Sequence, residues 1–283
     1  MKLKDYLKKA QKEKWTVGQF NFSTFEQLRG IIAAAQKTKS PVILGTSQGE
    51  LNYLGLKEVL ALVEISKLRS LTSLFLNLDH GKDLNWIKKA IDFGYSAVHF
   101  DGSELPFKKN MKCAKRIVEY AHKKGVLVEG ELGYLRGGSN FHKKIARIEK
   151  EDLTLPEKAY KFVRETKVDS LAIAIGNIHG IYTGMPKLDF ERLKEINNKT
   201  NAFLVLHGGS GIPKAEIKKA IKFGIVKVNI NTELRLIWKK TLEKSFKVQE
   251  IRPYKILPKV QKAIQKKVEE KMNLFNSNYK SYQ

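Results

Sequence analysis

The alternation of short apolar segments with helical stretches along the whole chain restricts the fold more than any other feature of the sequence. Apolar runs of four to eight residues, bounded by polar loops, are typical of buried strands, and the stretches between them have the periodicity of amphipathic helices. Several helical stretches stop at a glycine, the residue that most often follows a helix. Eight apolar runs occur, at residues 17–22, 41–47, 71–79, 97–101, 126–133, 170–176, 203–208 and 225–231.

Eight strand–helix units in 283 residues predict an α/β fold, a (β/α)8 TIM barrel. A doubly wound sheet is the alternative, but it needs a glycine-rich turn after its first strand, and residues 21–27 (NFSTFEQ) contain no glycine. Residues 255–275 have the pattern of an extra amphipathic helix, and the last eight residues are expected to fray. We therefore expect one domain over residues 1–283, with residues 255–283 as a C-terminal helical extension.

The composition indicates where such a protein would reside. Hydrophobic residues make up 42% of the chain, enough for a large core, and no apolar run is long enough to cross a membrane. The basic N-terminus lacks the apolar segment and cleavage site of a signal peptide. The single cysteine, Cys113, excludes an internal disulfide framework and fits a reducing cytoplasm. We expect a cytoplasmic protein without a membrane partner.

The net charge of +24 allows two interpretations. A strong basic excess suggests an anionic partner, either nucleic acid or phosphorylated small molecules. The alternative is a set of solvated, lysine-rich helix faces. Lysine pairs such as Lys8-Lys9, Lys88-Lys89 and Lys218-Lys219 occur in nearly every helical stretch and form no single stripe. This distribution favours solvated faces, so we expect no specific nucleic-acid partner.

Reactive side chains collect where the predicted strands end, the rim at which barrel enzymes carry their active sites. Three of the six histidines, His80, His179 and His207, lie there, with Asp79 beside the first. Three neutral imidazoles with one open position are typical of a catalytic Zn²⁺ site, so the sequence predicts a metal. The other histidines are interpreted as structural, because they fall within a strand, a helix and a loop: His99, His122 and His142.

Glycines and small polar residues follow the last three predicted strands. Gly180 follows His179, Gly208 to Ser210 follow His207, and Asn229 to Thr232 lead into a helix. Barrels often bind phosphate with the loops after strands 7 and 8, beside a helix N-terminus, and glycine lets backbone N–H groups approach an anion. A tight turn without a ligand explains one glycine pair but not the recurrence, so we predict a phosphate site beside the metal.

Over roughly residues 15–240 the chain resembles the class II, metal-dependent fructose-bisphosphate aldolases, a family that includes tagatose-bisphosphate aldolases. The resemblance implies cleavage of fructose 1,6-bisphosphate, or of another ketose phosphate, into dihydroxyacetone phosphate and an aldehyde (glyceraldehyde 3-phosphate for the fructose ester), and the reverse reaction. It also implies a homodimer or homotetramer. The segments that carry it, in order and spacing, are NLDHG, HFDGSELPFKKN, VEGELG, IGNIHGIY, VLHGGSG and KVNINTEL.

The resemblance also implies roles for individual residues. Zn²⁺ on His80, His179 and His207 would polarise the C2 carbonyl. Asp79 would take the C4 hydroxyl proton in cleavage and return it in condensation. Asp101 and Glu131 would take part when the metal shifts or a second divalent or monovalent cation binds. The substrate, held mainly by its C1 phosphate, would be bound by Asn21, Ser47, Gly180, Gly208, Gly209, Ser210, Asn229, Ile230, Asn231 and Thr232.

Two departures from the family pattern leave questions open. The family arginine that recognises the C6 phosphate is displaced here across Pro253 to Arg252, and a proton-moving glutamate in the loop at residues 134–152 is either Glu149 or Glu151. Three alternatives to this function also stay open. A Schiff-base aldolase needs a desolvated lysine, and only Lys227, deep below the rim, qualifies. The second is a tagatose-specific enzyme, and the third is a non-catalytic sugar-phosphate or nucleic-acid binding protein.

Overall fold

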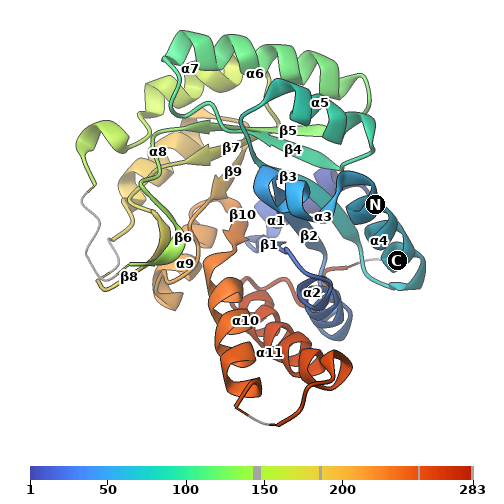
Figure 1. Ribbon diagram of the computed structural model, residues 1–283. Helices are drawn as coiled ribbons and strands as arrows, with labels where there is room; N and C mark the ends of the chain where they lie inside the picture. The colour runs from blue at the N-terminus through green and yellow to red at the C-terminus, as the bar shows by residue number, and fades with distance from the viewer. Residues whose placement is uncertain (143–147, 185–186, 248, 282–283) are drawn as a thin grey trace.

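Eight parallel strands close into a barrel in the computed structural model, which describes residues 1–142, 148–184, 187–247 and 249–281. Each strand lies within or overlaps one of the eight predicted runs, so the (β/α)8 fold is confirmed. Their order around the barrel is β1-β10-β9-β7-β5-β4-β3-β2 (Figure 1). The strands are β1 (Val17–Asn21), β2 (Val42–Ser47), β3 (Leu74–Gly81), β4 (Ala97–Phe100), β5 (Leu127–Leu132), β7 (Ser170–Ile173), β9 (Phe203–Leu206) and β10 (Ile225–Ile230).

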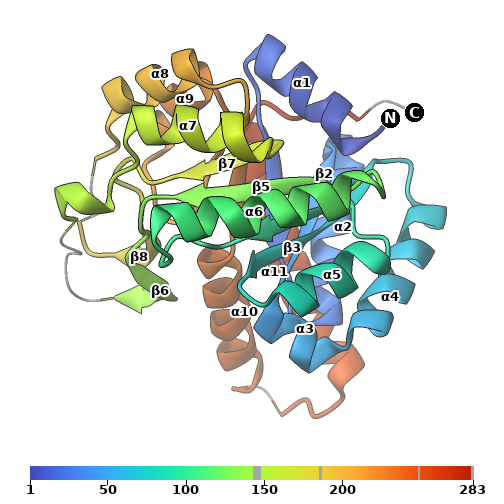
Figure 2. The same cartoon turned by 90° about the horizontal axis from the view of Figure 1, so that it is seen from above.

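Helices surround the barrel, as Figures 1 and 2 show. Most pack an apolar stripe on the strands; in α6 the stripe is Ala114, Ile117, Val118 and Ala121, at helical spacing, whereas α10 packs mainly against the C-terminal helix. A short helix, α3 (Gln48–Leu54), follows β2 before the main helix of that unit. The outer helices are α2 (Phe25–Thr38), α4 (Leu56–Arg69), α5 (Leu84–Asp92), α6 (Phe107–His122), α7 (Pro156–Thr166), α8 (Phe190–Lys199), α9 (Lys214–Lys222) and α10 (Thr232–Ser245).

An N-terminal helix, α1 (Leu3–Glu13), covers the N-terminal end of the barrel and was not expected from the sequence. Its buried residues Leu3, Tyr6, Leu7 and Ala10 recur at helical spacing, but lysines between them hide the pattern. With residues from the strand starts, such as Phe75, they form a second apolar cluster beneath the main core.

The predicted C-terminal helix is α11 (Pro253–Leu274), which packs against α2 and runs beside α10 (Figure 1). At Gly30 on α2 a Cβ atom would lie 2.8 Å from the Gln261 carbonyl, so glycine permits this close approach. The expected fraying of the tail is wrong up to residue 281: the Tyr279 and Ser281 N–H groups donate to carbonyls at the end of α2 and just after it. Residues 282–283 lie outside the described part of the chain.

A second, two-stranded parallel sheet also was not predicted. It pairs β6 (Gly137–His142) with β8 (His179–Tyr182) and is separate from the barrel. Its pairing carries His179, which the sequence placed just past a predicted strand, and His142, which the sequence placed in a loop. A short 3-10 turn, η1 (Lys150–Asp152), precedes α7. No helix of the described chain is both long and apolar enough to span a bilayer.

Candidate active site

Three histidines from distant parts of the chain meet at the C-terminal rim of the barrel. His80 lies at the end of β3, His179 begins β8 and His207 follows β9. The ring centroid of His80 lies 4.8 Å from those of both His179 and His207, which are 6.2 Å apart. His80 has a φ of 49°, a strained value for a non-glycine residue, where the register of β3 on β4 shifts.

Carboxylates that contact the rings of His80 and His207 indicate which ring nitrogens of these two residues carry hydrogen. Nδ1 of His80 lies 3.0 Å from Asp101, and Nε2 of His207 lies 2.7 Å from Glu129. Since an ionised carboxylate only accepts, these two nitrogens are assigned as N–H donors. The opposite nitrogens, His80 Nε2 and His207 Nδ1, then face each other 3.1 Å apart.

The third histidine adds an unpaired nitrogen to the same place. His179 Nε2 is buried and has no hydrogen-bond partner among the described residues. A buried polar atom of this kind needs an explanation, and a bound ion is one of the usual ones. Three imidazoles that line one cavity fit a transition-metal cation.

His99, interpreted from the sequence as structural, lies inside this cluster. Its ring centroid is 4.8 Å from that of His80 and 4.7 Å from that of His207. Its Nδ1 accepts the backbone N–H of His80 at 3.1 Å, and its Nε2 lies 3.0 Å from Glu131. Because both ring nitrogens already face neighbours, His99 fits a supporting residue better than a metal ligand. Among the described residues, Asp79, His80, His99 and His207 form one group whose atoms lie close enough to hold a cation, and Asp101 and Glu131 form a second with His80.

The protonation of the site suits metal binding and proton transfer. Burial, together with the charge of His80, lowers the pKa of His179 to about 4, and burial also lowers the pKa of His207. Both are therefore neutral near pH 7. Burial alone would raise the pKa of Asp79, but the neighbouring His80, His99 and His207 hold that pKa well below its ordinary value. Asp79 is therefore an ionised carboxylate.

Asp79 is oriented by two side-chain amides from strands of the same barrel. Asn21 on β1 donates to Oδ2 at 2.9 Å, and Asn229 on β10 donates to Oδ1 at 3.0 Å. Asn21 also donates to Glu50 at 3.1 Å. A carboxylate held by two amides beside the histidines has the position of a proton carrier.

The cluster opens into a cavity of about 140 Å³. One wall is the N-terminus of α10, where the helix dipole favours an anion. Asn231 is the N-cap residue of α10, but its side chain makes no capping hydrogen bond. The Ser210 hydroxyl instead accepts the N–H of Glu233 at 3.3 Å. The cavity is lined by Ser47, Asp79, His80, His179, Gly180, His207, Gly208, Ser210, Asn229, Asn231, Thr232 and Arg235.

Five residues predicted for the site do not line this cavity. Asn21 acts on Asp79, and Asp101 and Glu131 contact His80. The N–H of Gly209 donates to the Asn229 carbonyl at 3.1 Å, and the side chain of Ile230 belongs to the apolar core. The neighbouring glycine, Gly208, has a φ of 63°, and a Cβ atom there would lie 2.0 Å from the Ile178 carbonyl. Close backbone packing thus requires glycine at position 208.

Arg235 was not found from the sequence. It is the only lysine or arginine among the described residues that line the cavity. Its Nη2 lies 2.8 Å from Oε1 of Glu50, a buried carboxylate that caps α3. Arg235 stands three residues after Thr232 on α10, so helical spacing puts both on one face. That spacing was the available signal.

The charged residues that departed from the family pattern lie away from this cavity. Arg252 is exposed at the start of α11, where it pairs with Glu250 at 2.7 Å, and does not line the cavity. Neither Glu149 nor Glu151 lines it. Glu149 precedes η1, and Glu151 lines a separate pocket beside α7.

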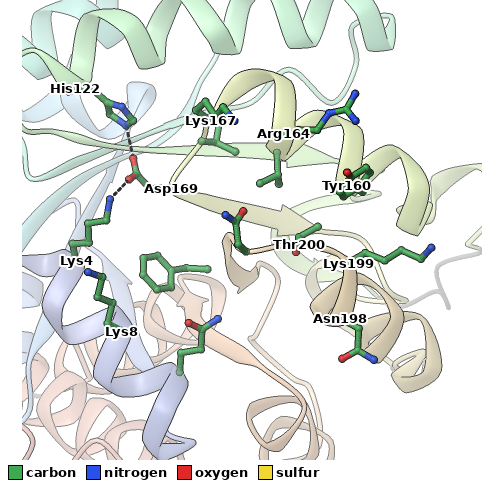
Figure 3. Close-up of a pocket in the computed structure, with 15 residues that line it drawn as sticks. Lys4, Lys8, His122, Tyr160, Arg164, Lys167, Asp169, Asn198, Lys199 and Thr200 are labelled. Atoms are coloured by element: carbon green, nitrogen blue, oxygen red, sulfur yellow. Dashed lines mark hydrogen bonds and ion pairs between the residues drawn. The ribbon is translucent and has the colours of Figure 1, made fainter.

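A larger cavity, of about 690 Å³, lies at the opposite, N-terminal end of the barrel between α1, α7 and the start of β9 (Figure 3). Its contacts are structural: Asp169 accepts from Lys4 on α1 at 3.0 Å and contacts His122 on α6 at 2.8 Å. The backbone N–H of Val128 donates to the same carboxylate. This carboxylate fastens two helices to the barrel and is remote from the histidine cluster.

Comparison with known proteins identifies relatives over the whole chain. The family model described as class-II fructose-bisphosphate aldolase matches residues 1–280. A fructose-bisphosphate aldolase of Geobacillus stearothermophilus is 38% identical over 99% of this chain and 98% of the relative. A 6-phospho-5-dehydro-2-deoxy-D-gluconate aldolase of Shouchella clausii is also 38% identical, over 96% and 93%. The crystal structure of the YdjI aldolase of Escherichia coli K12 superposes with a TM-score of 0.86 at 30% identity, over 100% and 99% of the two chains.

Proposed function

The chain belongs to the class II fructose-bisphosphate aldolase family, and from that premise we propose that it is a zinc-dependent aldolase that cleaves fructose 1,6-bisphosphate reversibly into dihydroxyacetone phosphate and glyceraldehyde 3-phosphate. Such an enzyme is an aldehyde-lyase that serves glycolysis and gluconeogenesis. One observation carries the proposal. Imidazole nitrogens of His80 and His207 face each other beside the ionised carboxylate of Asp79, and His179, whose buried Nε2 has no partner among the described residues, lines the same cavity, which ends on a helix N-terminus.

The residues that would hold the metal are His80 through Nε2, His207 through Nδ1, and His179. Nitrogen ligands from three imidazoles suit Zn²⁺ and leave a position open for substrate. When bound, Zn²⁺ supplies a Lewis acid that polarises the C2 carbonyl of the ketose. Asp101 and Glu131 would hold a second cation beside His80.

Asp79 carries the proton in this proposal. In cleavage it takes the proton from the C4 hydroxyl oxygen, and in condensation it returns that proton to the same oxygen. Its low pKa keeps it ready to accept, and the amides of Asn21 and Asn229 fix the direction of its two oxygens. The adjacent His80 couples its position to the metal site.

The anionic part of the substrate would lie against α10. The N-terminus of that helix, with Ser210 and Thr232, offers N–H and hydroxyl groups, and the loops at Gly180 and Gly208 bring backbone close to the same cavity. Ser47, Gly209, Asn229, Ile230 and Asn231 complete the proposed substrate-binding set. Arg235 adds a positive charge at its edge.

A second candidate substrate follows from the relatives. Relatives named 6-phospho-5-dehydro-2-deoxy-D-gluconate aldolase are as similar to this chain as those named for fructose bisphosphate. Both substrate names place a ketone beside a phosphorylated carbon, and they differ at the far end, which is a phosphate in one and a carboxylate in the other. Arg252 pairs with Glu250 at the surface and does not line the cavity. Within one chain it therefore does not contact the far end of a substrate held there.

We further propose a cytoplasmic homodimer or homotetramer. The exposed apolar side chains Phe246, Ile251 and Tyr254, where α10 gives way to α11, support self-association. The single cysteine, Cys113, supports a reducing compartment.

A substrate panel tests the proposed reaction. Fructose 1,6-bisphosphate, tagatose 1,6-bisphosphate, fructose 1-phosphate and 6-phospho-5-dehydro-2-deoxy-D-gluconate are compared at equal concentration, with formation of dihydroxyacetone phosphate as the readout. We expect fructose 1,6-bisphosphate to have the highest kcat/KM. A higher value for the gluconate derivative would replace the proposed substrate but keep the site, and no cleavage of any of the four would overturn the proposal.

A further inference from the structure

A buried ion pair lies beneath the histidine cluster, and one of its two members contacts His207. Lys227 on β10 and Glu129 on β5 meet in the barrel interior, with Nζ 2.6 Å from Oε2 and side chains 4% and 3% exposed. Desolvation offsets much of the attraction between two buried charges, and apolar side chains of similar volume are often at least as stable. A charged pair at this depth therefore calls for a reason other than stability.

The other oxygen of Glu129 contacts a proposed metal ligand. Oε1 lies 2.7 Å from Nε2 of His207, whose side chain is 1% exposed. The amide nitrogen of Asn229 lies farther from that ring, at 3.3 and 3.4 Å, and donates to Asp79 at 3.0 Å. Glu129 thus makes the shortest contact to His207 and decides which ring nitrogen carries the hydrogen.

We propose that Glu129 and Lys227 are positioning residues for His207, which hold its hydrogen on Nε2 so that Nδ1 faces the metal. The inference rests on the proposed function, in which His207 is a metal ligand. Lys227 fixes the carboxylate from the far side, and the Ser170 hydroxyl lies 3.4 Å from the same oxygen. Residues of three strands, β5, β7 and β10, thereby set the direction of one ring.

The physical effect of such a unit is on metal affinity. A carboxylate that accepts the second N–H of a histidine fixes the tautomer and the ring direction and makes the free nitrogen a stronger ligand. Removal of partners of this kind typically weakens metal binding by about 10- to 100-fold. The unit also disfavours Lys227 as a Schiff-base lysine, since its ammonium group is paired with Glu129.

The variants must remove the acceptor without leaving a buried charge. Glu129→Met alone would strand Lys227, so the main variant is the double substitution Glu129→Met/Lys227→Met, which keeps side-chain volume. Glu129→Gln/Lys227→Met retains an amide oxygen that can still accept from Nε2, and serves as partial rescue. The matched control is Glu157→Gln, since Glu157 forms an exposed ion pair with Lys199 away from the site.

Two measurements test the inference. The first is the Zn²⁺ dissociation constant, by competition with a chromophoric chelator. The second is the tautomer of His207 in the metal-free protein, from ¹H–¹⁵N NMR of the imidazole. We expect the hydrogen on Nε2 in the wild type. The double-Met variant should lose that preference and bind Zn²⁺ about 10- to 100-fold more weakly, with the Gln/Met variant between them and Glu157→Gln unchanged.

The outcomes separate this inference from the proposed function. A wild type with the hydrogen on Nδ1, or a double-Met variant that binds Zn²⁺ within twofold of the wild type, overturns the positioning role while the metal site stands. A wild type that binds no Zn²⁺ overturns the proposed function, and the tautomer measurement still decides the role of Glu129. If the double-Met variant does not fold, the wild-type tautomer and the Gln/Met variant decide it.

Discussion

At the scale of single residues, Asp79 is the side chain on which turnover should depend most. Asp79→Asn keeps the shape and can still accept from one of the two amides of β1 and β10, but it removes the proton acceptor. We expect kcat for aldol cleavage to fall by about 10²- to 10⁴-fold, the usual contribution of general acid–base catalysis. Zinc content, measured by mass spectrometry, should stay near the wild-type value, because Asp79 is not one of the three proposed ligands. A variant that loses its zinc but keeps its activity per bound zinc would contradict this role.

Arg235 should control substrate affinity rather than the chemical step. Arg235→Gln removes the only described cation that lines the cavity. Because charge-assisted contacts to phosphate contribute roughly 1.5 to 3 kcal/mol, KM for fructose 1,6-bisphosphate should rise by about one to two decades with little change in kcat.

The matched comparison for Arg235 is Arg252→Ala at the start of α11. If only the Arg252 variant raises KM for the bisphosphate while the Arg235 variant behaves as wild type, recognition comes from the displaced arginine, in an assembled oligomer. If both leave KM unchanged, neither arginine binds the substrate.

The residues found from the sequence and those missed differ in a physical way. Asp79, His80 and His207 could be predicted because they follow apolar runs directly, and strand ends meet at one rim. Glu129 and His99 lie within strands, where the apolar character of the run conceals an inward-facing polar side chain. Glu129 stands two residues before Glu131, on the same face of β5, and this period-two spacing was the signal.

At the scale of elements, the segment between β5 and α7 should open in acid. Burial raises the pKa of Asp152, but a hydrogen bond from Arg136, at 2.5 Å, and the N–H of Glu149 lower that pKa by more, so it lies below its ordinary value. A lowered folded-state pKa gives stability that is present above the unfolded value of about 3.9 and is lost as pH falls through the folded value.

The measurement is the hydrogen-exchange protection factor of the Tyr134 N–H, which donates to the Asp152 carbonyl at 2.8 Å. We expect it to be constant from pH 7 to about 5 and to decrease below about pH 4, near the unfolded pKa of an aspartate. Arg136→Gln should lower it at neutral pH and flatten its acid dependence. A wild-type protection factor that stays constant down to about pH 2.5, well below that unfolded pKa, would show that the Asp152 carboxylate does not hold this segment.

The attachment of α1 to the barrel should depend on Asp169. Asp169→Asn keeps the side-chain shape but weakens the contacts to Lys4 and His122 that Figure 3 shows. Since hydrogen bonds to charged groups contribute about 1.5 to 3 kcal/mol each, we expect a loss of about 1 to 3 kcal/mol in the free energy of urea unfolding. Glu165→Gln, in an exposed pair with Arg164, is the control and should match the wild type. Equal midpoints for all three proteins would contradict the structural role of this carboxylate.

Among the elements, the eight barrel strands were predictable because buried parallel strands are continuous apolar runs that periodicity detects. The helix α1 was not, since lysines separate its apolar residues. The sheet of β6 and β8 was not, because its two strands are short, polar and joined only by pairing across 36 intervening residues, 143–178. The tail was expected to fray because its composition is polar, yet its backbone bonds to the end of α2 fix it.

At the scale of the whole molecule, the barrel separates function from stability. Its C-terminal rim collects the histidines, the carboxylates and the cavity beside α10, whereas its N-terminal end is closed by α1 and the apolar cluster beneath it. The barrel interior between them is polar, with Glu129 and Lys227 below the histidines. The net charge of +24 gave little information on function, because the lysines are spread over the outer helices.

The most direct test of the central claim is aldol cleavage of fructose 1,6-bisphosphate as zinc is titrated into chelator-treated protein. The proposed site is built from His80, His179 and His207, so we predict no activity without metal and a linear recovery that reaches its maximum at one Zn²⁺ per chain. Full activity in excess chelator, combined with borohydride trapping of the substrate on Lys227, would contradict the metal mechanism and establish a Schiff-base aldolase instead.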